Sequence, residues 1–104
     1  MRSDELDFPH KDEIVAALRA ADPNIKKIFL FGSRARGDNL SPVADIDVGI
    51  LAENRLSLWQ LEKLNAALEA LPTLYRIDLV DFTGRDDEFT REALADMKVL
   101  YEKR

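Results

Sequence analysis

Apolar residues recur along this chain at two spacings, and the spacing separates helices from strands. A helical spacing marks three segments: 7–22 before Pro23, 57–71 before Pro72, and a last segment that starts at Asp86 or Asp87 and runs to about residue 103. Three short apolar runs have the length and composition of strands, namely 26–31, 45–51 and 75–82. The pattern therefore predicts an α/β fold in which helices pack against one sheet.

The order of these segments predicts part of the sheet's topology. The strands 45–51 and 75–82 are joined through the helix 57–71, so we expect them to be parallel neighbours. Apart from its two lysines, the strand 26–31 is apolar on both faces, which favours a position in which both faces of the strand are buried. We expect Trp59 to lie in the core together with the leucines that share one face of the helix: Leu58, Leu61, Leu64, Leu68 and Leu71.

Length and composition restrict the class of protein. The chain has 104 residues, which fits one small domain over residues 1–104, and its 46% hydrophobic content favours a folded chain. The absence of cysteine excludes disulfides and thiolate metal sites. No apolar run is long enough for a membrane span or a signal peptide, so a cytoplasmic protein with no membrane partner is expected. The net charge of −5 argues against a long nucleic acid as partner.

Two aspartates open the strand 45–51, although aspartate is depleted in strands. Because side chains alternate along a strand, we expect Asp45 and Asp47 on one face, with Cα atoms roughly 6.6 Å apart. Two carboxylates at that distance repel by roughly 2–3 kcal/mol at an effective dielectric of about 20, so solvent, a cation or raised pKa values must offset the repulsion. Asp78 interrupts the next strand in the same way, and three carboxylates on adjacent strands can hold two Mg²⁺ ions.

The segment after the first strand has the composition of a phosphate-binding loop. Gly32 lets the backbone approach a ligand closely, and Ser33 adds a hydroxyl and an N–H. Successive N–H groups after a strand form an anion-binding concavity, to which Arg34 or Arg36 can add bidentate phosphate contacts. Loop and carboxylates together predict a site for a nucleoside triphosphate and its metal.

Each of these features also has an ordinary structural explanation. The segment 32–37 taken alone can be a surface turn, and a lone Asp-x-Asp pair is usually solvated. Asp81 competes with Asp78 for the role of third carboxylate, but it stands at the strand end, where turn aspartates are common. A further acidic group is expected to cap the last helix: Asp86, Asp87 and Glu88. The combination of loop and three carboxylates is what favours a site.

One known family carries the same motifs in the same order. Through FGSRARGD, ADIDVGI and RIDLVD, the chain resembles the minimal nucleotidyltransferases (MNT) of the DNA polymerase beta superfamily, and among them the antitoxins of HEPN/MNT toxin–antitoxin pairs. The resemblance covers about residues 28–81, and the last twelve residues are also similar. It implies a mixed sheet whose first two strands are joined by the Gly-Ser turn. It further implies metal ligands at Asp45, Asp47 and Asp78, and triphosphate contacts from Gly32 and Ser33.

The activity that this resemblance implies is a Mg²⁺-dependent transfer of AMP from ATP to an acceptor hydroxyl. For the MNT antitoxins the acceptor is a tyrosine of a HEPN ribonuclease toxin, a separate chain and the expected partner. Asp45 and Asp47 would bind the metal that chelates the triphosphate, and Asp78 would help to hold a second metal and deprotonate or orient the acceptor. Two alternatives stay open. One is an antitoxin that neutralises its HEPN partner by contact alone; the other is a small-molecule nucleotidyltransferase whose pocket is completed in a homo- or hetero-oligomer.

Overall fold

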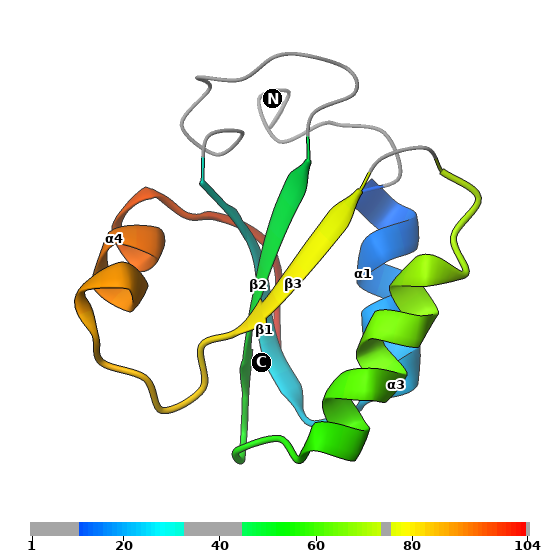
Figure 1. Ribbon diagram of the computed structural model, residues 1–104, viewed down its shortest axis with the longest axis horizontal. Coiled ribbons are helices and arrows are strands. Elements are labelled where there is room, and N and C mark those ends of the chain that lie inside the picture. The colour runs from blue at the N-terminus through cyan, green and yellow to red at the C-terminus, as the bar shows by residue number, and fades with distance from the viewer. Residues whose placement is uncertain (1–10, 33–44, 74–75, 104) are drawn as a thin grey trace.

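The fold is a four-stranded mixed sheet with helices on both faces, seen in a computed structural model that describes residues 11–32, 45–73 and 76–103 (Figure 1). The described residues form three helices and four strands. In chain order these are α1 (Lys11–Ala21), β1 (Ile25–Phe31), β2 (Ile46–Ala52), α3 (Leu58–Glu69), β3 (Ile77–Asp81), α4 (Glu88–Asp96) and β4 (Lys98–Glu102).

The sheet has the strand order β3-β2-β1-β4. β2 and β3 are parallel neighbours, which confirms the topology expected from their helical connection. β1 pairs antiparallel with β2 on one side and with β4 on the other. Because β1 runs opposite to β2 and β3, its carboxyl end meets their amino ends at one end of the sheet.

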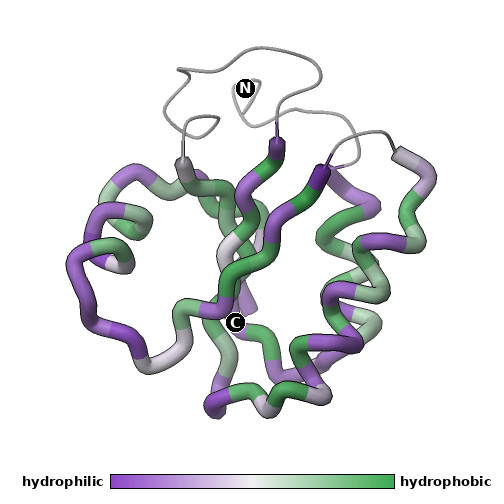
Figure 2. The backbone as a smooth tube through the Cα atoms, in the orientation of Figure 1, coloured by the Kyte–Doolittle hydropathy of each residue, from purple (hydrophilic) through white to green (hydrophobic). Residues whose placement is uncertain are grey.

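Two separate layers of core cover the sheet. α1 and α3 lie on one face and α4 lies on the other (Figure 1). The face below α1 and α3 is aliphatic and includes Ile28 and Val48, whereas the face below α4 carries Phe29, Phe31 and Phe82. Both faces of β1 are therefore buried, as its apolar sequence predicted. In Figure 2 the middle of the sheet is largely hydrophobic, while the amino-terminal tips of β2 and β3 are hydrophilic.

Local interactions fix where the last two helices begin. α3 starts with a capping box, in which Ser57 Oγ accepts from Gln60 N at 3.1 Å and Gln60 Oε1 accepts from Ser57 N at 2.8 Å. At α4, Asp87 Oδ1 accepts from Thr90 N at 2.9 Å, which confirms Asp87 as a helix cap. The helices thus begin at the polar residues that the sequence supplies.

The structure corrects the prediction of one long terminal helix. α4 ends at Asp96, and β4 then pairs with β1 as an edge strand. The apolar positions from 89 to 100 fit a helical period, yet the open edge of β1 offers hydrogen-bond partners that favour an extended chain for Val99 and Tyr101. Tertiary pairing therefore overrides the local pattern here.

The leucine face of α3 is only partly core. Leu64 and Leu68 are buried, and Leu61 and Leu71 pack against that cluster. Leu58 and Trp59 are 75% and 66% exposed, so the expectation that they lie in the core was wrong. Both stand in the first turn of α3, and the Trp59 ring is covered instead by the Lys63 ammonium, 4.8 Å from its centroid.

None of the helices in the described ranges is long and apolar enough to cross a membrane.

Candidate functional site

The predicted carboxylates come together at the end of the sheet where β1 ends and β2 and β3 begin. The register pairs Phe31 of β1 with Asp47 of β2, and Asp47 with Asp78 of β3. Asp45 stands one residue before β2. Directly paired residues of neighbouring strands point to the same face, so Asp47 and Asp78 lie on the face that carries α4. Their neighbours Ile46 and Ile77 pack on the opposite, aliphatic face.

Burial and the neighbouring negative charges both raise the pKa of Asp47. Partial burial is the largest cause that raises the pKa of Asp47, and the negative charges of Asp78 and Asp45 raise it further. Asp45 and Asp78 therefore both lie close enough to Asp47 to act on its carboxylate. A cation beside Asp47 would reverse this shift, because an opposite charge favours the ionised carboxylate.

Gly32 follows β1 directly and lies close to the Asp47 carboxylate. Its φ of +79° lies in the left-handed region, and a Cβ at this position would stand 2.5 Å from Asp47 Oδ2. Any residue with a side chain would thus be strained by its backbone and would also collide with the carboxylate. The glycine lets the chain leave β1 directly over Asp47. Ser33, Arg34 and Arg36, the other predicted phosphate contacts, lie outside the described residues.

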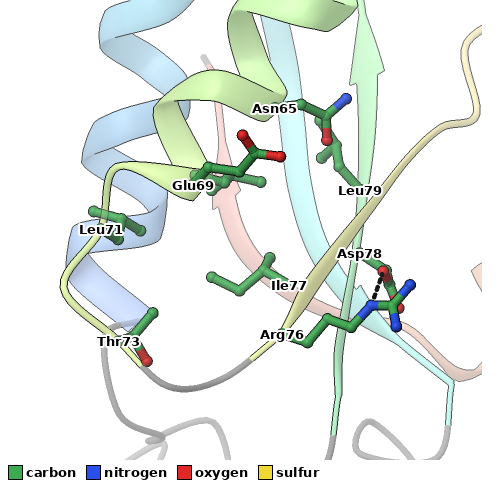
Figure 3. Close-up of a pocket in the computed structure, with 9 residues that line it drawn as sticks. Asn65, Glu69, Leu71, Thr73, Arg76, Ile77, Asp78 and Leu79 are labelled. Atoms are coloured by element: carbon green, nitrogen blue, oxygen red, sulfur yellow. Dashed lines mark ion pairs between the residues drawn. The ribbon is translucent and has the colours of Figure 1, made fainter.

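Asp78 lies on the edge strand β3 and is one of the residues that line a pocket along this strand. Arg76 Nε approaches Asp78 Oδ1 at 3.4 Å, and both side chains are well exposed, at 77% and 41% (Figure 3). The pocket has a volume of about 420 Å³ and runs along β3, so that residues of both faces of this strand line it. The carboxyl end of α3 and the segment that follows form its other wall, with Asn65, Glu69, Leu71 and Thr73 (Figure 3). A molecule that enters from this edge can reach Asp78.

Asp81, the competitor of Asp78, has a local structural role. Its Oδ1 accepts from Thr83 N at 2.9 Å and from Thr83 Oγ1 at 2.6 Å. It stands at the far end of β3 from the carboxylates, where it stabilises the turn toward α4. Of the two aspartates in this strand, Asp78 is the one paired with Asp47.

A second cavity of about 450 Å³ adjoins Asp47 on the other side. Gly32 and Asp47 line it from the sheet, and residues of α4 line it from the helix. The lining residues from β1 and α4 are Phe31, Phe89, Glu92, Ala93, Ala95 and Asp96. None of the α4 residues was assigned a role in the site from the sequence, since no local pattern shows that this helix lines a cavity together with Asp47.

The donor atoms of this site suit a hard divalent cation. Asp45, Asp47 and Asp78 offer only carboxylate oxygens, the ligands that Mg²⁺ prefers. Within the described ranges, no three acidic or histidine side chains are placed so that they could hold a metal ion together. Asp78 instead pairs with Arg76. The side chains are thus of the chemical type that binds Mg²⁺, but their positions do not form a three-carboxylate metal site.

Comparison with known proteins finds similar sequences and similar folds. The family model described as "Polymerase beta, Nucleotidyltransferase" matches residues 12–104. The protein adenylyltransferase MntA of Shewanella oneidensis is 29% identical over 96 residues, and the match covers 88% of this chain. It covers 65% of MntA, so the chain spans just under two thirds of the length of that relative.

Two solved structures have the same fold. One is a crystal structure of a toxin–antitoxin with AMP-PNP, which matches with a TM-score of 0.63 and 29% identity over 90% of this chain and 74% of that chain. The other is the tri-AMPylated HEPN toxin of Shewanella oneidensis in complex with an MNT antitoxin, which matches with a TM-score of 0.57 and 28% identity over 90% of this chain and 71% of that chain.

Proposed function

This chain belongs to the polymerase beta nucleotidyltransferase family, and on that premise we propose that it transfers AMP from ATP to an acceptor hydroxyl. The observation that carries the proposal is the row formed by Asp47 and Asp78, in register on adjacent parallel strands, with Gly32 packed against the Asp47 carboxylate. The acceptor that we propose is a tyrosine of a partner HEPN toxin, because the related MntA is a protein adenylyltransferase. The cytoplasm, where ATP is available, is the compartment that this reaction needs.

The donor nucleotide lies on the Gly32 side in this proposal. Asp45 and Asp47 would hold Mg²⁺ together with the triphosphate, and the backbone at Gly32 is close enough to Asp47 for one ligand to contact both. A bound Mg²⁺ neutralises charge that develops on the phosphate oxygens. Ser33, Arg34 and Arg36 follow Gly32 directly in the sequence and supply the remaining phosphate contacts that we propose.

The acceptor approaches from the edge of β3. Asp78 is reachable through the pocket along this strand, so its carboxylate can accept a hydrogen bond from an incoming hydroxyl and take its proton. The hydroxyl oxygen then forms a bond to the α-phosphorus of ATP, the bond from that phosphorus to the bridging oxygen breaks, and pyrophosphate leaves. Donor and acceptor thus enter on opposite sides of the carboxylates.

Intact-mass spectrometry tests this proposal. The chain is incubated with a HEPN protein encoded beside it, with ATP, and with or without Mg²⁺. We expect the HEPN protein to gain one or more AMP units only when both ATP and Mg²⁺ are present. A HEPN protein that forms a complex with the chain and gains no AMP under these conditions would favour an antitoxin that acts by contact alone.

A further inference from the structure

We propose that Phe89 is the surface on which the base of the nucleotide stacks, and that α4 therefore forms the base-binding wall of the site. This inference rests on the proposed function, because it assigns a residue to the nucleotide of that reaction. It concerns the cavity between Gly32, Asp47 and α4 rather than the pocket along β3.

The Phe89 ring is packed among other side chains and yet about half exposed. It packs edge-on against Phe31, with ring centroids 6.0 Å apart, and lies 5.6 Å from the ring of Phe82 at a tilt of 34°. Its side chain nevertheless remains 48% exposed. The Arg85 guanidinium carbon also lies 5.6 Å from the centroid of this ring. A ring that is held by these contacts and still lines a cavity offers a stacking surface.

The charged residues that line the cavity favour one orientation of a bound nucleotide. The α4 side of the cavity carries Glu92 and Asp96, which disfavour a triphosphate there. Gly32 and Asp47 line the same cavity from the sheet, where a metal-bound triphosphate is expected to lie. A nucleotide with its phosphates at Gly32 therefore directs its uncharged base toward α4.

The size and shape of the cavity agree with this orientation. A volume of about 450 Å³ lies in the range of small-molecule sites, roughly 300–1,000 Å³. Ala93 and Ala95 add little bulk to the same wall, which leaves the Phe89 ring accessible. An acceptor side chain is a weaker match for this position, because the open approach to Asp78 lies at the edge of β3.

Calorimetry with two probes tests the inference. AMP-PNP carries the base, whereas inorganic tripolyphosphate has the phosphates alone, and both are measured with Mg²⁺. We expect Phe89→Leu to weaken AMP-PNP binding by about tenfold, since stacking on an aromatic ring is lost. Tripolyphosphate binding should not change. Phe89→Tyr keeps the ring and should retain the affinity for AMP-PNP. Trp59→Leu is the matched control, because it removes an exposed aromatic ring of α3 that lies outside this cavity.

Each result separates the inference from the function on which it rests. Unchanged AMP-PNP affinity in Phe89→Leu would overturn the inference while leaving the nucleotide site intact. An equal loss for both probes would also overturn it, because the ring would then matter only for the shape of the site. If the unmodified chain bound neither probe, the proposed function itself would fail.

Discussion

Replacing Gly32 by alanine tests whether this residue positions the Asp47 carboxylate. The added methyl would stand 2.5 Å from Asp47 Oδ2, well inside van der Waals contact, so the carboxylate has to move. In addition, a residue with a Cβ in the left-handed region costs about 1–2 kcal/mol. For a domain of this size we expect Tm to fall by about 4–8 °C per kcal/mol.

Gly84 provides a matched control for the backbone strain. Its φ is +74°, close to that of Gly32, but a Cβ there would meet nothing within 4 Å. Gly84→Ala should therefore lose a similar amount of stability from strain alone. The difference between the two variants then reports the contact with Asp47.

The assay is thermal unfolding with and without Mg²⁺ and AMP-PNP. A ligand at about 100 times its Kd stabilises the folded state by about 2.7 kcal/mol, which the unmodified chain and Gly84→Ala should both show as a rise in Tm. Gly32→Ala should lose most of this rise, because its displaced carboxylate no longer meets the metal and the phosphates. An equal ligand-induced rise in both variants would refute the idea that Gly32 positions Asp47.

Three further predictions follow from other residues. Folding raises the pKa of Asp47, so the folded state binds the proton more tightly than the unfolded state, and stability falls as the pH rises from about 4 through the raised value. In Asp47→Asn this fall should disappear. The Tm values of the two proteins, measured against pH, should therefore be most similar at low pH and should separate as the pH rises. Gly49→Ala should destabilise the fold by about 1–3 kcal/mol in urea unfolding, because its methyl would collide with the rings of Phe29 and Phe82. Ser57→Ala should cost about 1 kcal/mol in the same experiment through loss of the α3 cap, while AMP transfer stays unchanged.

Features that depend on local alternation could be predicted from the sequence. The three strands and the parallel pairing of β2 with β3 follow from apolar runs and from the helix that connects the two strands. Asp87 could be predicted as a helix cap because a capping side chain accepts from a backbone N–H within the next three residues, here that of Thr90. These features need no knowledge of the rest of the chain.

Features that depend on contacts between distant segments could not be predicted in this way. Residues 98–102 form a strand only because β1 has an open edge for them. Trp59 is exposed in the first turn of α3, whereas Leu64 and Leu68 further along the helix are buried. The helical period shows which face of a helix is apolar but not where along the helix the packing begins. The position of Phe89 beside Asp47 likewise depends on how α4 packs on the sheet.

The substitution Asp47→Asn tests the central claim, that the carboxylates catalyse transfer of AMP, most directly. It keeps the shape of the side chain and removes its charge, and Asp86→Asn serves as a control for charge on a side chain 92% exposed. Both variants are compared with the unmodified chain for AMP transfer to the HEPN partner by intact mass and for binding to that partner by calorimetry. The account predicts that Asp47→Asn loses transfer by several orders of magnitude, because metal-held charge stabilisation is lost, while it retains partner binding and has a metal-free Tm no lower than that of the unmodified chain. Transfer by Asp47→Asn at the rate of the Asp86→Asn control would contradict the account.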